Sequence, residues 1–414
     1  RDPSLGYRCA KFVRRNRVMV GAGTAVMAAL AVGLATTAWQ ARVAHAEQQR
    51  AEAVKNFVSG LFTDADPFST RSKAPTVEAL LQTAQQRLDG AAGGGPAVRV
   101  ELLEMIARSF YGMGLFDRAE PLFVQAIAEA QRELGEQHEL TQRVRLSMLP
   151  VHRFRGRRAE IKGELDALLP GLRAARTPAQ RELLLEAMTA GVHLAIDEGR
   201  YAQARDEAAE VLALATAVHG ELHAGTADAA LLVASAGHFL GDAQAALDAA
   251  IRARDLLLRV HGRESPHAKV LDGRFMVGRA LGNVGRFAEA RAELVDVLAQ
   301  VQQVLGAEAP MTAFVANDIA RFALELGDEP TALRHAQMTL AVATRDAADD
   351  SQTVAMARLQ LGRALLAMHR SEEAAALLAR AAQAIGAARG AHSPLAIDAT
   401  TLHAAALAQA GRRE

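Results

Sequence analysis

Arginine recurs at one fixed phase of this 414-residue chain. Arg279, Arg321 and Arg363 follow one another at intervals of 42 residues, and Arg108 stands at the same phase nearer the N-terminus. A guanidinium group is a planar donor that binds a carboxylate or phosphate through two hydrogen bonds. Stacked repeats would turn these side chains into a ladder of anion-binding groups. The alternatives are a solvated face or an internal ion-pair network. Acidic candidates for that network are Asp272, Asp318 and Glu325.

A glycine landmark lies six residues after each of these phases. The landmarks are Gly114, Gly156, Gly199, Gly241, Gly285, Gly327 and Gly411, with His369 at the same phase. Successive spacings are 42, 43, 42, 44, 42, 42 and 42 residues. A fixed period of about 20 to 50 residues indicates stacked supersecondary units. Half of the residues are apolar and only 4% are aromatic, which favours helices. The sequence therefore predicts an all-α fold.

The residues around each landmark predict a pair of helices joined by a tight turn. Five residues after the landmark stands a small side chain, which lets the two helices approach: Ala119, Ala204, Ala246, Ala290, Ala332 and Ala374, with Ile161 as the exception. A second glycine stands 21 residues after the landmark in five units: Gly135, Gly220, Gly262, Gly306 and Gly390. We expect it to end the second helix in a left-handed cap. An aromatic residue two positions after the landmark is expected to wedge the turn: Phe116, Tyr201 and Phe287.

This pattern of glycine, aromatic residue and alanine resembles the tetratricopeptide repeat, over residues 97–414. The 42-residue unit resembles the kinesin light chain subclass. The resemblance implies a right-handed α-solenoid in which the arginine column faces a concave groove. It also implies that Asn317 and Asp318 hold a ligand's backbone there. Pro150 and Ile161 depart from the pattern, so we expect the second repeat to be irregular.

Residues 18–41 contain no charged side chain. Because about 20 helical residues cross a hydrocarbon core, we interpret this stretch as a transmembrane helix. Residues 1–17 form a basic segment, which would place the N-terminus in the cytoplasm and the repeats outside it. A cleaved signal peptide, with Ala44-His45-Ala46 as cleavage site, is the alternative. A small-residue stripe in this stretch would allow a homodimer; packing against lipid is the other reading.

Residues 42–96 are expected to form a stalk helix and a linker before the repeats. Residues 4–17, 50–62 and 65–67 resemble the segment that joins a cytoplasmic kinase to outer repeats in bacterial membrane serine/threonine kinases. The resemblance implies a kinase domain upstream of residue 1. Within the chain itself no glycine-rich phosphate loop or other kinase motif occurs, so we predict that this chain is not an enzyme.

The composition argues against several other classes of function. Lys plus Arg equals Asp plus Glu at 47 each, which gives no electrostatic reason to expect nucleic acid as a partner. Histidine recurs in the inter-repeat loops, where we expect turn residues and no metal site: His138, His261, His267 and His392. His219 and His223 are not expected to share a helical face, since Gly220 ends the helix. No cofactor is predicted.

The sequence thus predicts a single-pass protein of the bacterial inner membrane with extracytoplasmic repeats. We expect the repeats to bind a protein or peptide in their groove, as the sensor or docking part of a serine/threonine kinase. The alternative is a membrane-anchored scaffold for envelope complexes that never carried a kinase.

Overall fold

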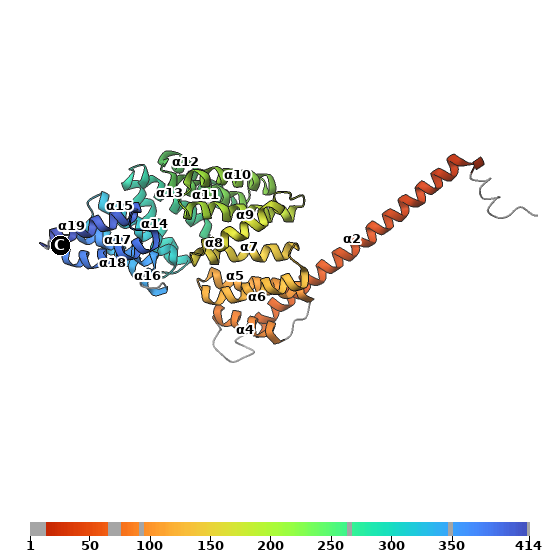
Figure 1. Cartoon of the computed structure of the whole chain (residues 1–414), viewed down its shortest axis with the longest axis horizontal. Helices are drawn as coiled ribbons and strands as arrows, with labels where there is room; N and C mark the ends of the chain where they lie inside the picture. Colours follow the sequence, from red (N-terminus) through yellow and green to blue (C-terminus); the bar gives the residue numbers. More distant parts are fainter. Residues whose placement is uncertain (1–13, 65–75, 91–94, 263–266, 347–350, 412–414) are drawn as a thin grey trace, which may run out of the picture. The chain divides into compact units, whose positions relative to one another are not determined.

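The computed structural model describes residues 14–64, 76–90, 95–262, 267–346 and 351–411 (Figure 1). The regular structure in these residues is helical. The chain divides into two compact units, Arg1–Arg157 and Arg158–Glu414. The predicted basic segment falls largely on residues 1–13, and parts of the predicted linker fall on 65–75 and 91–94. These lie outside the described residues.

The first unit begins with one long helix and continues with shorter ones. Its helices are α2 (Arg17–Asp64), α4 (Val77–Gly90), α5 (Gly95–Gly112), α6 (Phe116–Leu134) and α7 (Glu139–Phe154). The core lies between α5, α6 and α7, with Phe110 and Phe123 among its largest buried side chains. Val54 and Phe57 of α2 pack against this core. The expected continuation of one helix beyond residue 42 is therefore confirmed.

The second unit is a stack of antiparallel helix pairs. Its helices are α8 (Arg158–Leu172), α9 (Pro178–Asp197), α10 (Tyr201–His219), α11 (Ala224–Leu240), α12 (Ala243–His261), α13 (Ala268–Asn283), α14 (Phe287–Val304), α15 (Pro310–Glu325), α16 (Glu329–Asp346), α17 (Gln352–Ala367), α18 (Ser371–Arg389) and α19 (Pro394–Gln409). We call the helix before each landmark helix A and the one after it helix B. The boundary between the two units separates α7 from α8, which is the repeat whose sequence predicts irregular packing.

The landmark glycines form the predicted turns between helix A and helix B. All seven have a positive φ, from 69° at Gly327 to 87° at Gly241. This backbone region favours glycine because it has no Cβ. The alanine five residues later is buried in every unit that has it, as is Ile161. Phe116 stacks on Phe154 with ring centroids 3.6 Å apart, as a wedge against the neighbouring helix requires.

The second glycine of each unit differs from the prediction. Gly135, Gly220, Gly262 and Gly390 have φ between 86° and 97° but ψ between 144° and 170°. This backbone is extended with a positive φ, whereas a left-handed cap has ψ near about 47°. The predicted left-handed cap is therefore wrong. The region is essentially open to glycine alone, and it directs the chain away from helix B toward the next helix A.

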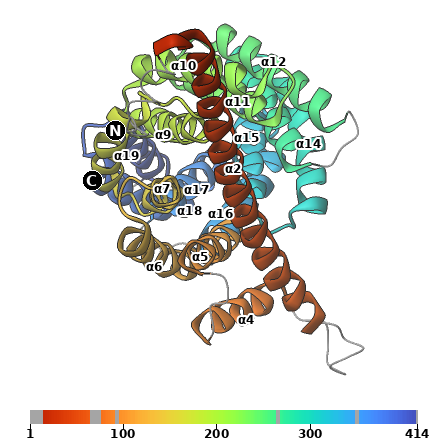
Figure 2. The same ribbon diagram turned by 90° about the vertical axis from the view of Figure 1, so that its right-hand side faces the viewer.

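Contacts between successive pairs place the A helices on the inner side of the stack in the second unit. Each A helix from α9 to α19 packs against the next A helix as well as against its B partners. Among the described residues, no two consecutive B helices contact each other in this way. The outer positions of α10, α12 and α14 around α11 and α15 can be followed in Figure 2. Side chains on the open surface of the A helices therefore converge, while those on the B helices diverge.

The predicted transmembrane helix is wrong. Among the described residues, no helix combines the length and the apolar character needed to cross a bilayer. The apolar stretch is poor in large side chains, since Ala, Gly and Thr occupy 14 of the 24 positions from 18 to 41. It continues without a break into the charged half of α2. The prediction of a single-pass protein in the inner membrane rested on this helix and is wrong with it.

His369 offers a test of the turn geometry. It is the one non-glycine residue with positive φ, 58°, in the part of the chain that the structure describes. Because a Cβ is strained in this region, His369→Gly should stabilise the turn between α17 and α18 by about 0.5–1 kcal/mol. Amide hydrogen exchange of these two helices would slow accordingly. Gly285→Ala, the reverse change at the same phase, should accelerate exchange in α13 and α14; an unchanged rate in both variants would contradict this reading.

Candidate functional site

The predicted arginine column lies near the C-terminal ends of successive A helices. Arg279 lies on α13, Arg321 on α15 and Arg363 on α17, all in the second unit. The spacing of the repeats brings the first two of them to one polar cluster. We call the exposed surface formed by α11, α13, α15 and α17 around these arginines the A-helix face.

Arg279 and Arg321 share a single buried carboxylate. The Nε of Arg279 donates to Oδ2 of Asp318 at 2.7 Å, and Nη2 of Arg321 lies 3.4 Å from Oδ1. The side chain of Asp318 is 5% exposed, against 23% for Arg279 and 34% for Arg321. Two cations meet one anion here, so the cluster keeps a surplus positive charge. The two terminal nitrogens of Arg279 form no hydrogen bond that the described residues provide.

Each of these arginines also lies over an aromatic ring. The guanidinium carbon of Arg279 is 4.5 Å from the ring centre of Phe275, and that of Arg321 is 4.4 Å from Phe322. Both rings are buried. Cation–π contacts of this kind hold the guanidinium plane in place without consuming its hydrogen-bond donors. The donors at the edges of the groups therefore remain available.

Two further residues of the cluster were not anticipated from the sequence. Asn283 lies 2.5 Å from Nδ1 of His238 through its amide nitrogen, and its Oδ1 lies 3.4 Å from Nη1 of Arg321. Burial, followed by the charge of Arg279, lowers the pKa of His238 to about 4, while Asp318 acts in the opposite direction. His238 is therefore neutral at pH 7. A signal existed: both residues stand three or four positions after the arginine phase, on the same side of helix A.

The remaining predicted residues of the second unit lie beside this cluster. Arg363 forms an ion pair with Asp398 on α19. Asn317 is half-buried, and no hydrogen bond of its side chain to another described residue is found. Of the three acidic candidates for an internal network, only Asp318 pairs with the column. Burial raises the pKa of Asp272, against a lowering effect of Lys269, and Glu325 is exposed.

Arg108 lies in the first unit, on α5, and has other partners. Its Nη1 is 3.4 Å from the hydroxyl of Ser147 and 3.7 Å from Oε1 of Glu104. The carboxylate of Glu104 is buried and also accepts hydrogen bonds from Ser147 and Arg143. The first unit thus repeats the theme of basic side chains around a buried carboxylate, with different residues.

The loop histidines cap the helices that follow them. The Nδ1 atoms of His138, His223 and His267 accept hydrogen bonds from backbone N–H groups two residues further on. Rings also stack in pairs, with 3.9 Å between the centres of His261 and His267. Within the described residues, no three potential metal ligands lie close enough to hold an ion.

Comparison with known proteins connects these features to one repeat type. Tetratricopeptide repeat family profiles match residues 100–139 and 275–345. No curated protein sequence matches the chain. The fold is similar to a Rap protein crystallised with competence and sporulation factor, at 15% identity over 70% of this chain and 77% of that one, with a TM-score of 0.53. It is also similar to NprR in complex with its cognate peptide NprX, at 13% identity over 71% and 82%, with a TM-score of 0.52.

A putative kinesin light chain from Podosopora anserina is also similar, at 18% identity over 50% of this chain and 96% of that one, with a TM-score of 0.40. None of these similarities links the chain to a kinase, which stays a prediction from the sequence, as does a homodimer. The second family profile spans α14 and α15 and reaches Arg279 and Arg321. The chain therefore contains tetratricopeptide repeats, and its two units are all-helical and TPR-like.

Proposed function

We propose that the A-helix face of the second unit binds a peptide or protein segment that carries acidic side chains. The observation that carries this proposal is the pairing of Arg279 and Arg321 with one carboxylate, that of Asp318. A ligand carboxylate would meet the surplus charge of the cluster and the unused donors of Arg279. Since these guanidinium groups already lie over buried rings, little side-chain entropy is lost when the ligand binds.

Two further observations support a peptide as the ligand. The half-buried side chain of Asn317 has no described partner and stands beside Asp318, where its amide can bind an extended backbone. The Rap protein and NprR, which share the fold, were crystallised with a bound factor or peptide. A link to a kinase has no comparable support in the structure. Reading the coding sequence upstream of residue 1 for kinase motifs would test it.

The proposal predicts opposite effects from two neighbouring substitutions. Fluorescein-labelled hexapeptides with one to three Glu residues serve as probes, and their binding to the full chain is measured by fluorescence anisotropy. Arg321→Gln should weaken binding about tenfold, because one charge-assisted hydrogen bond is lost. Asp318→Asn should strengthen it, because the competing carboxylate is neutralised while the side-chain shape is kept.

Arg274→Gln is the matched control. Arg274 lies on the same helix as Arg279, but it bonds Glu293 and Asp296 of α14 and so belongs to the helix A–helix B contact. Its loss should leave peptide affinity unchanged. Equal affinities of wild type, Arg321→Gln and Asp318→Asn would overturn the proposal and leave the arginines as parts of an internal ion-pair network.

A further inference from the structure

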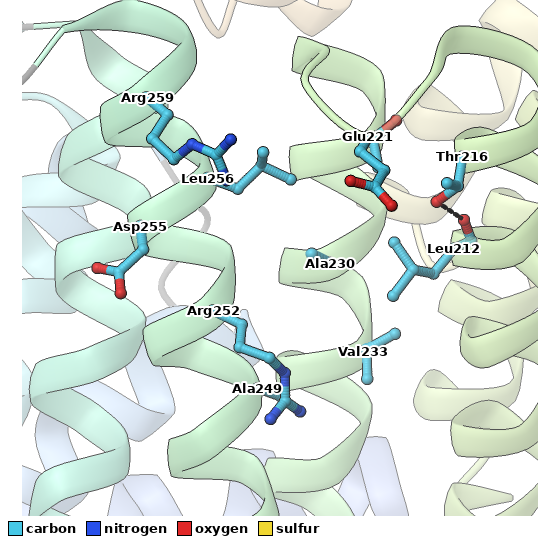
Figure 3. A pocket seen from close by; sticks show the side chains of 11 residues that line it. Leu212, Thr216, Glu221, Ala230, Val233, Ala249, Arg252, Asp255, Leu256 and Arg259 are labelled. Atoms are coloured by element: carbon cyan, nitrogen blue, oxygen red, sulfur yellow. Dashed lines mark hydrogen bonds between the residues drawn. The ribbon is translucent and has the colours of Figure 1, made fainter.

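A second recess lies away from the A-helix face. A pocket of about 550 Å³ opens between α10, α11 and α12 (Figure 3). Thr226, Ala230 and Val233 of α11 line it, and they are spaced so that they share one side of the helix. Asp228 is two residues from both Thr226 and Ala230, which places it about 200° around the helix, on the other side. The pocket and the A-helix face thus lie on opposite sides of α11.

The inner part of the pocket is apolar. Leu212 comes from α10, Ala230 and Val233 from α11, and Ala249 and Leu256 from α12. The volume is in the range of sites that enclose a small molecule or a large side chain, which is about 300–1,000 Å³. An apolar group that entered would leave water for a surface formed by three helices.

Two arginines without partners stand at the rim. Arg252 and Arg259 are exposed and lie seven residues apart on α12, with Leu256 between them on the same side. No ion pair or hydrogen bond joins either guanidinium to another described residue. Seven helical residues place the two Cα atoms about 10.5 Å apart. Of the landmark-aligned units in the sequence, only this one has arginine at both phases.

The acidic side chains of the pocket compensate only part of this charge. The carboxylate of Asp255 accepts from Arg254 at 2.7 Å, so it is already neutralised. Glu221 faces the pocket from the loop after α10 and pairs with neither rim arginine. One positive charge therefore remains when Glu221 is set against the two guanidinium groups.

The hydroxyl groups of the pocket are already used by the fold. Thr216 donates to the carbonyl of Leu212 at 2.8 Å, and Thr226 donates to the carbonyl of Gly220 at 2.7 Å. The donors left for a ligand are those of Arg252 and Arg259. This arrangement selects an anionic partner with an apolar group between its charges.

We propose that this pocket is a second binding site, for an acidic peptide segment with a large apolar side chain between two carboxylates. An extended peptide rises about 3.3 Å per residue, so carboxylates three residues apart are separated by about 10 Å and match the two arginines. The intervening side chain enters the apolar part beside Leu256. The site is independent of the A-helix face, and one chain can hold two segments at once.

The test uses the full chain in the Arg321→Gln background, which weakens the A-helix face. The probes are fluorescein-labelled Glu-x-x-Glu peptides in which x is Leu, Ile, Phe, Met or Trp, compared with Lys-x-x-Lys and Glu-Gly-Gly-Glu sets. Affinity is measured by anisotropy at about 150 mM salt, where long-range attraction is screened. We expect saturable binding of the Glu-x-x-Glu set and about tenfold weaker binding after Arg252→Gln with Arg259→Gln.

Arg334→Gln is the matched control, since Arg334 is an exposed arginine on the B helix α16 outside the pocket. It should leave the affinity unchanged, and circular dichroism should show the same helicity in all variants. Equal binding of Glu-Gly-Gly-Glu and Glu-x-x-Glu peptides would mean charge attraction alone and would overturn the proposal. So would unchanged binding after loss of both rim arginines. Neither result bears on the A-helix face, whose own test is the comparison of Arg321→Gln with wild type.

Discussion

Replacing both Arg279 and Arg321 by alanine is expected to destabilise the second unit by about 3–5 kcal/mol. The double variant leaves the carboxylate of Asp318 buried with no cation beside it. Each single variant should cost less, because the other arginine still neutralises the charge. The measurement is native-state hydrogen exchange of α13 and α15, followed by mass spectrometry, which reports the opening free energy of this region separately from the rest of the array.

Asp318→Asn provides the control for this effect. In the background of the double variant it removes the buried charge, so it should restore a large part of the lost protection. Additive single-variant costs, or no rescue by Asp318→Asn, would show that the shared carboxylate does not couple the two repeats.

Gly282→Ala is expected to have the second large effect. A Cβ at this position would lie 1.9 Å from Cζ of Phe322, a buried side chain on the next A helix. The ring must move, and overpacking of this kind costs about 1–3 kcal/mol. Because Arg321 lies over the same ring, we also expect weaker binding of acidic peptides.

Gly386→Ala is the matched control for that substitution. Gly386 lies inside α18, and a Cβ there would meet no atom within 4 Å. Alanine in a helix interior is favoured over glycine by about 0.5–1 kcal/mol, so this variant should gain stability. Accelerated exchange in α13 and α15 of Gly282→Ala, with slower exchange in α18 of Gly386→Ala, is the expected result. Equal rates in Gly282→Ala and wild type would contradict the close approach of the two A helices.

The local parts of the fold could be predicted because they depend on single residue types at fixed spacing. A glycine with positive φ and a buried alanine five residues later recur throughout the array. His369 follows the same backbone without being glycine, so phase predicted its conformation where residue type did not. The second glycines show the limit of this reasoning. The requirement for glycine was visible, but ψ depends on where the next helix lies.

The candidate site could be predicted only in part because its contacts cross repeats. The phase of Arg279 and Arg321 followed from the period, but their shared partner lies 39 residues from one and three from the other. Spacing alone does not indicate which acidic residue is buried, so Asp272 and Asp318 were equal candidates. His238 and Asn283 were missed because neither recurs at its phase. The apolar stretch of α2 was misread because absence of charge is a weaker criterion than large apolar side chains.

The central claim is that acidic peptides bind the A-helix face. The most direct test is photo-cross-linking of the full chain with an acidic hexapeptide that carries a benzophenone group, followed by peptide mapping. The account predicts cross-links to α13 and α15, within residues 275–283 and 317–325, and their loss in Arg321→Gln. Cross-links confined to the B helices α14 and α16, or a pattern unchanged by Arg321→Gln, would contradict it.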